Sequence, residues 1–280
     1  MKHYTFLAFL FLTLASCNKE LSFENETFEK ESTIPCKKDC PKITIDVPIA
    51  KNIDVVADSI NKKVFSVIKE IVYFEEDPSK ANDYKTLAAS FITSYEEMHK
   101  KFPDETFGWE GKIKGNVEFE SDQIINIKID HYTFTGGAHG YQGFRSLLFH
   151  PKTGKTIFTD EIFKNENEFK AFAEKEFRKK YKIPEKSNIN ATGLMFENDK
   201  FQLPQNIFYT NDGLLLYYNS YEAASYADGP KELLFSYAKV SKYLKYRQSF
   251  LNTILKTIKL KINLFLLFIY LVFILIFSIC

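Results

Sequence analysis

The spacing of the hydrophobic residues changes near Trp109, and this change limits what the chain can fold into. Before that point, two segments repeat apolar residues every three or four positions, the pattern of a helix with one buried face. They are Ile53, Val56, Ile60, Val64, Val67, Ile68 and Ile71, and then Leu87, Phe91, Tyr95 and Met98. From Trp109 onwards apolar and polar residues alternate, as they do in half-buried β-strands.

The order of these elements predicts an α+β fold with antiparallel sheet segments and packed helices. A strand is expected over residues 42–47, before the two helices, and a third helix is expected to run to about residue 181. Further strands are expected over residues 109–120, 123–135, 141–150, 156–158, 200–203, 207–210, 214–218 and 231–236, with a short helix over 237–245. Because strands follow one another in runs, a doubly wound sheet is not expected.

The pattern also suggests where the chain divides. We expect a single extracytoplasmic module with room for two subdomains. A strand-plus-helices part is predicted at residues 36–108 and a sheet-rich part at residues 109–245.

Residues 1–16 have the parts of a bacterial export signal: a basic start, a short apolar run and small residues before a cysteine. The apolar run is too short to span a bilayer. The cysteine resembles the one in the lipobox of lipoproteins, so lipid attachment is predicted at Cys17; an ordinary signal peptide with a chance cysteine is the alternative. Asn18 after it favours the outer membrane, at the periplasmic face or the cell surface. Residues 17–35 are polar and aperiodic, and a flexible tether is expected there.

Charge and cysteine content narrow the function classes. The net charge is +1 and no basic stripe is present, so a nucleic-acid partner is not expected. Cys36 and Cys40 are separated by three residues, whereas a thioredoxin-type site needs two. No second Cys or His pair follows at ligand spacing, so a small local disulfide is favoured over a metal knuckle. No metal and no cofactor are predicted.

A glycine-rich stretch, HYTFTGGAHGYQGF at residues 131–144, interrupts the strand pattern. Its histidine, His139, could be a base, a metal ligand or a hydrogen-bonding strut. His131, His139, His150 and Asp130 could be imagined as a metal cluster, but no ligand-pair motif supports one. A structural turn is the first interpretation and ligand recognition the second. The candidate ligand-binding residues in this stretch are Tyr132, Gly136, Gly137, His139 and Tyr141.

A second loop, at residues 221–229, carries two tyrosines and two carboxylates. Its tyrosines either cover an edge of the core or line a groove with the glycine-rich stretch. An acidic, aromatic rim of this kind would suit a cationic protein ligand. The candidate ligand-binding residues here are Tyr221, Glu222, Tyr226 and Asp228.

Three motifs occur in order: YTFTGGAHG, then FHPKTGKTIFTDEIF, then FYTNDGLLLYYNSYEAASYADGPKELLFSYAKVSKYL. Over roughly residues 40 to 245 they resemble the RsiV-like and PdaC N-terminal-like family of bacterial envelope domains. That family includes the extracytoplasmic domain of a lysozyme-responsive anti-sigma factor and a module that precedes the catalytic domain of peptidoglycan deacetylases. The resemblance implies an α+β binding or sensing domain. The lipoprotein signal departs from the anti-sigma member, so sigma-factor regulation is not expected here.

Residues 246–280 form a hydrophobic tail whose last 19 residues could span a bilayer. The basic residues precede the span and none follow it, against the positive-inside tendency of an exported chain. A frameshift or readthrough extension is expected, with a real second anchor as the alternative.

Together these features predict a lipid-anchored, non-enzymatic, ligand-binding or sensing domain of the bacterial envelope. Its predicted partners are the membrane, through the lipid, and a lysozyme-like protein or peptidoglycan. The alternatives are an envelope hydrolase that acts on peptidoglycan or carbohydrate, with His139 near the chemistry, and a structural envelope lipoprotein. No nucleophile elbow and no paired carboxylate motif supports the hydrolase, so no catalytic residue is predicted.

Overall fold

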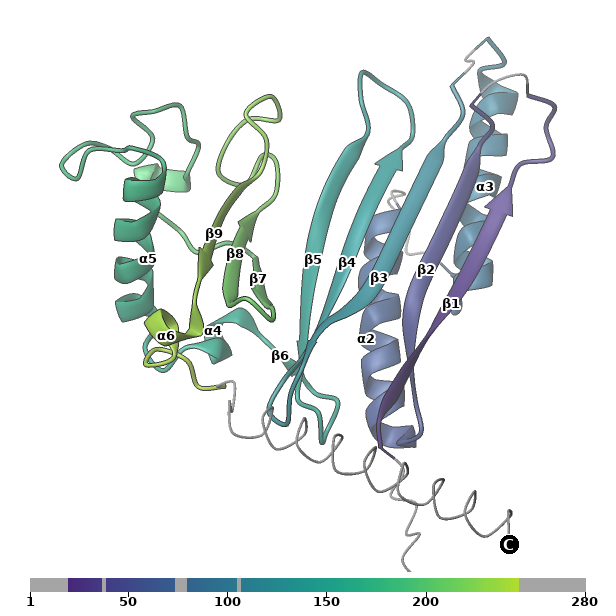
Figure 1. Cartoon of the computed structure of the whole chain (residues 1–280). Helices are drawn as coiled ribbons and strands as arrows, with labels where there is room; N and C mark the ends of the chain where they lie inside the picture. Colours follow the sequence, from purple (N-terminus) through teal and green to yellow (C-terminus); the bar gives the residue numbers. More distant parts are fainter. Residues whose placement is uncertain (1–19, 37–38, 74–79, 105–106, 247–280) are drawn as a thin grey trace, which may run out of the picture.

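The computed structural model describes residues 20–36, 39–73, 80–104 and 107–246 (Figure 1). The predicted signal peptide, the lipidation site Cys17 and most of the predicted tail lie outside these residues. No helix of the described part is long and apolar enough to cross a membrane.

A six-stranded sheet forms the first part of the molecule. Its strands are β1 (Ser22–Glu31), β2 (Lys42–Lys51), β3 (Glu110–Glu120), β4 (Ile125–Phe134), β5 (Tyr141–Phe149) and β6 (Thr156–Ile157), in that spatial order. All neighbours are antiparallel except β2 and β3, which run parallel. A parallel pair needs a long crossover, and the helices α2 (Asp54–Val72) and α3 (Tyr84–Lys101) provide it.

Both helices cover one face of the large sheet (Figure 1). The apolar side chains on one face of each helix and the alternate inward-facing side chains of β2 and β4 belong to one core. Asp83 starts α3 with a capping box: its carboxylate accepts a hydrogen bond from the Thr86 N–H at 2.7 Å. The core includes Ile43, Ile45, Val47, Val56, Ile60, Val64, Ile68, Leu87, Phe91, Ile125, Ile127 and Ile129.

The second part has a three-stranded antiparallel sheet, β7 (Asn206–Tyr209), β8 (Leu214–Tyr218) and β9 (Lys231–Phe235). Around it lie α4 (Thr159–Ile162), α5 (Glu166–Lys180), a 3₁₀ turn at Glu197–Asp199 and α6 (Tyr237–Val240). Its core is rich in aromatic residues, and the Phe163 and Phe169 rings stack with their centroids 4.0 Å apart. The core also contains Phe177, Phe196, Phe201, Tyr218 and Phe235.

Three buried asparagines fasten the two parts together. The Asn126 Oδ1 accepts from the Tyr209 N–H at 2.8 Å, and the Asn206 Oδ1 accepts from the Ser146 N–H at 3.0 Å. The Asn219 amide bonds the Phe144 backbone twice, at 2.8 and 3.0 Å. Each amide thus reaches across to the backbone of the opposite part, which fixes how β7 packs on β4 and β5.

The predicted α+β class is confirmed, but the expected tether is wrong over residues 22–31, which form β1. This strand pairs with the whole of β2, and its Phe28 ring stacks on Tyr84 at 5.0 Å. Its remaining residues are largely exposed and mostly polar or charged because β1 lies at the sheet edge, and that hides the strand pattern in the sequence.

Two other expectations need correction. The division predicted between residues 108 and 109 falls inside the large sheet, since β2 pairs with β3. The two cores do not divide at one point of the sequence either, because the second core also contains Phe119, Ile124 and Leu148. The strand expected over 200–203 is absent from the described structure, although Phe201 is buried in the second core. Phe201 anchors residues 200–203 to the second core, but these residues pair with no neighbouring strand in the described structure.

Candidate functional site

The glycine-rich stretch forms the loop between β4 and β5. Gly136 and Gly137 have φ angles of +106° and +86°, and a Cβ added at either position would meet nothing within 4 Å. These glycines are therefore required for the backbone path and not for a close contact. Gly140 is different, because its added Cβ would lie 2.5 Å from the Tyr132 ring. Tyr132 thus supports the loop from β4 by packing on Gly140.

His139 lies on the exposed side of this loop and stacks on Tyr226 from the second loop. The ring centroids are 3.9 Å apart and the planes differ by 16°. The His139 Nδ1 is 2.9 Å from the Gly140 carbonyl oxygen, and the Tyr226 hydroxyl donates to the same oxygen at 3.3 Å. One backbone carbonyl therefore holds both rings, and the stack joins the two parts of the molecule.

The second loop presents its tyrosines to solvent. Tyr221 is 53% exposed and Tyr226 is 37% exposed, and their ring centroids are 5.7 Å apart. Asp228 accepts a hydrogen bond from the Ser225 hydroxyl at 2.5 Å. We name His139, Tyr221 and Tyr226 the histidine–tyrosine surface.

Glu222, a candidate for the acidic rim, instead holds the loop from inside. Its two carboxylate oxygens accept from the Gln205 N–H at 2.7 Å and the Asn219 N–H at 2.9 Å. Burial raises the pKa of this carboxyl, while these two backbone hydrogen bonds oppose the rise. The rim is therefore less acidic than the sequence suggested, with Asp228 as its carboxylate.

His131 and Tyr141 lie below the loop, with ring centroids 5.8 Å apart. His131 is 3% exposed, and neither ring nitrogen has a hydrogen-bond partner among the described residues. Burial, with a smaller contribution from the Arg145 charge, lowers the pKa of His131 to about 4. No group of three potential metal ligands occurs within the described ranges, and His131 is a neutral core residue here.

The structure thus brings together part of the predicted site. His139, Tyr221 and Tyr226 form one surface over the turn made by Gly136 and Gly137, whereas Tyr132, Tyr141 and Glu222 support it from below. The role of Asn219 in joining the two parts was not predicted, because a single asparagine after a strand carries no pattern that indicates a distant partner.

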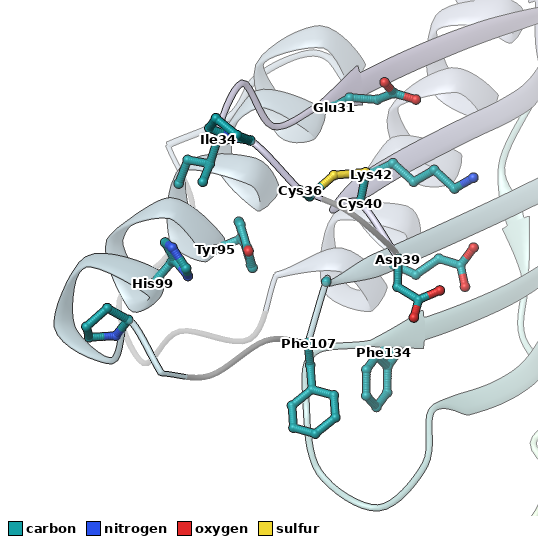
Figure 2. A pocket seen from close by; sticks show the side chains of 14 residues that line it. Glu31, Ile34, Cys36, Asp39, Cys40, Lys42, Tyr95, His99, Phe107 and Phe134 are labelled. Atoms are coloured by element: carbon teal, nitrogen blue, oxygen red, sulfur yellow. A yellow bond between two sulfur atoms is a disulfide. The ribbon is translucent and has the colours of Figure 1, made fainter.

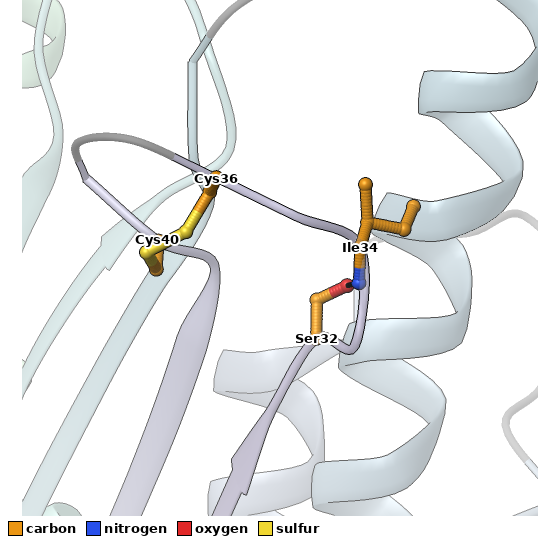
Figure 3. The surroundings of a disulfide bond; sticks show 4 residues. All are labelled: Ser32, Ile34, Cys36 and Cys40. Atoms are coloured by element: carbon orange, nitrogen blue, oxygen red, sulfur yellow. Dashed lines mark hydrogen bonds between the residues drawn. A yellow bond between two sulfur atoms is a disulfide. The ribbon is translucent and has the colours of Figure 1, made fainter.

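Cys36 and Cys40 form a disulfide, the pairing that their spacing favoured (Figure 3).

Replacing Gly137 by alanine should lower the free energy of unfolding by about 1–2 kcal/mol, since a Cβ is strained at positive φ. Gly137→Asn is the matched control, because asparagine tolerates this backbone region better. Both variants can be measured by urea denaturation. An alanine variant at least as stable as the asparagine variant would show that the loop does not need its left-handed backbone.

Two family models match the chain. Residues 34–142 match the one described as deacetylase PdaC, and residues 155–238 match the one described as a protein of unknown function (DUF3298). No curated protein gives a significant match. The gap between the two matched ranges, residues 143–154, covers most of β5 and the turn that follows it.

The fold is shared with solved structures of the DUF3298 family. The protein from Pseudomonas aeruginosa PAO1 has a TM-score of 0.58 and 20% identity, over 80% of this chain and 94% of that chain. The protein from Bacteroides fragilis NCTC 9343 has a TM-score of 0.58 and 18% identity, over 81% of this chain and 94% of that chain. Such identities establish the fold alone. With both models matched in order, the chain is similar to deacetylase PdaC over residues 34–142 and to DUF3298 proteins over residues 155–238, which is consistent with the envelope-domain resemblance seen in its sequence motifs.

Proposed function

We propose that this protein is a non-enzymatic ligand-binding domain that a lipid on Cys17 holds in the bacterial envelope, and that its ligand is a lysozyme-like protein or a peptidoglycan fragment. The observation that carries the binding role is the histidine–tyrosine surface. The exposed Tyr226 ring is held by the His139 stack and by the carbonyl that both side chains share, and the Tyr221 ring lies beside it. The envelope location rests on the export signal and cysteine of the sequence.

Exposed, fixed tyrosines suit binding for two physical reasons. A tyrosine ring offers a large apolar contact area together with a hydroxyl that can hydrogen-bond, and such residues dominate binding energy at interfaces. Rings that are already ordered lose little conformational entropy when a ligand arrives. Because Glu222 is occupied within the loop, aromatic contact should contribute more than charge, and salt should weaken binding only modestly.

Truncating Tyr226 to alanine should weaken binding by about tenfold or more, since it removes the ring that both Tyr221 and His139 contact. The measurement is calorimetry of the full chain in non-ionic detergent, titrated with lysozyme and, separately, with soluble peptidoglycan fragments. Phe158→Ala is the matched control, since this ring is 61% exposed but lies between β6 and α4. The proposal fails if neither ligand binds, or if the two variants bind equally well.

A further inference from the structure

A cleft of about 920 Å³ lies beside the Cys36–Cys40 disulfide, and none of the three residues of the histidine–tyrosine surface lines it (Figure 2). Its walls come from the turn between β1 and β2, the end of α3, the start of β3 and the end of β4. These segments are far apart in the sequence, and none of the site residues predicted from sequence other than the two cysteines lines the cleft.

The walls of this cleft are fixed before any ligand binds. Cys36 and Cys40 are joined by the disulfide (Figure 3), and the Ser32 hydroxyl earlier in this segment donates to the Glu96 carboxylate of α3 at 2.6 Å. On the opposite side, a Cβ added at Gly108 would lie 1.6 Å from the Asp39 carbonyl oxygen. Asp39 and Cys40 are therefore packed closely against the backbone that enters β3.

Aromatic rings line two sides of the cleft. The Tyr95 and His99 rings, both on α3, stack on each other with their centroids 5.8 Å apart. The Phe107 and Phe134 rings meet edge to face with their centroids 6.4 Å apart. Phe107 is 58% exposed, although it is one of the most apolar side chains. Figure 2 shows the two phenylalanine rings on one side of the cavity and the α3 pair on another.

The charges around these rings are mainly negative. Glu31, Asp39 and Glu110 line the cleft, against one cation, Lys42. Glu110 is paired with Lys112 at 2.6 Å, whereas Glu31 and Asp39 have no ion-pair partner among the described residues. The Asp39 backbone lies against Gly108, the residue after Phe107, so this carboxylate and the exposed Phe107 ring line the same cleft. An aromatic face next to a carboxylate without an ion-pair partner can bind the cationic head of a lysine or arginine side chain, while the aliphatic part of that side chain packs on the ring.

We propose that this cleft binds a lysine or arginine side chain of a basic polypeptide partner. The cation would lie over Phe107 and pair with Asp39, while its aliphatic stem packs along the aromatic walls. This is a second site, independent of the histidine–tyrosine surface, and it stands or falls separately from the function proposed above.

Trp109 supplies the measurement, because it is the single tryptophan of the chain and its ring lies 6.1 Å from Tyr95. Titrating the full chain in non-ionic detergent with tetralysine at low salt should give a saturable change in tryptophan fluorescence. About 0.5 M salt should weaken this binding strongly, because screening acts on the Asp39 contact. Tetraglutamate should give no change.

Two variants test the cleft itself. Asp39→Asn removes the charge but keeps the backbone, since Asp39 has a φ of +53° and asparagine tolerates this region. Phe107→Ala removes the exposed ring. Each should weaken tetralysine binding about five- to tenfold, whereas Tyr226→Ala should leave it unchanged.

The proposal is overturned if tetralysine gives no saturable change, or if the Asp39 and Phe107 variants bind it like the unaltered chain. A saturable response to chitotetraose in place of tetralysine would overturn it as well and assign the cleft to carbohydrate. Loss of lysozyme binding in Tyr226→Ala with tetralysine binding intact would separate the two sites.

Discussion

Replacing Asn126 by leucine should lower the free energy of unfolding by about 3 kcal/mol. Asn126 is fully buried, and its amide bonds groups on both parts of the molecule: the Tyr209 N–H, the Ser146 hydroxyl and two carbonyls of the large sheet. Leucine leaves the buried Tyr209 N–H without a partner, and an unsatisfied buried donor alone costs about 1–3 kcal/mol. The loss of the remaining bonds adds to this cost.

Guanidinium denaturation followed by two probes would measure this effect. Trp109 fluorescence reports on the first core and far-ultraviolet circular dichroism on the whole chain. If Asn126 fastens the two parts, the two transitions should coincide in the unaltered protein and move apart in the variant, because the second part then loses its support first.

Asn116→Leu on the neighbouring strand is the control. Asn116 is half-buried and bonds only the Glu118 side chain, so its replacement should change stability by less than about 0.5 kcal/mol. Equal effects at the two positions would show that the asparagine contacts do not hold the parts together.

The helices could be predicted from the sequence because burial on one face imposes a period. In α2, the side chains of Val56, Ile60 and Val64 are buried at the spacing the sequence shows. Edge strands have no such signal. In β1 polar and charged residues occupy most positions, since one edge and much of one face meet water, and the segment therefore has the composition of a tether.

The site could be predicted only in part, because several of its residues contact partners that are far away in the sequence. The glycine loop could be recognised from its own residues, but nothing in the sequence indicates that His139 stacks on Tyr226 or that β2 pairs with β3. Those contacts depend on how two cores dock. For the same reason Glu222, which looks like a rim carboxylate in sequence, turns out to bond two backbone N–H groups.

Stability should also fall as the pH drops from about 6.5 to about 4, through His131. In the folded protein the pKa of His131 is lowered to about 4 from an ordinary value of 6.5, first by burial and then by the charge of Arg145. Between these two values the unfolded chain binds a proton on this ring and the folded protein does not, so acid favours unfolding. The difference between the two pKa values corresponds to about 3 kcal/mol.

The packing around His131 explains why the folded protein cannot relieve this cost. A Cβ added at Gly143 would lie 3.0 Å from the His131 Nε2 and 3.2 Å from the Asn219 Oδ1, so the backbone closes over the ring. The Asn219 amide already bonds the Phe144 N–H and carbonyl. A protonated ring would therefore be buried beside Arg145 with neither nitrogen partnered by a described residue.

Other groups titrate in the same range, so the test is a difference between two proteins. Hydrogen bonding to Ser32 lowers the pKa of Glu96, which also costs stability in acid, whereas burial raises the pKa of Glu222, which acts in the opposite direction. Unfolding free energies measured from pH 4 to 7 for the unaltered chain and for His131→Leu cancel these shared contributions. The difference should change by about 3 kcal/mol across the range. A flat difference for His131→Leu would mean that the folded protein accommodates the charged imidazole, and that the two parts open around it more readily than their asparagine contacts suggest.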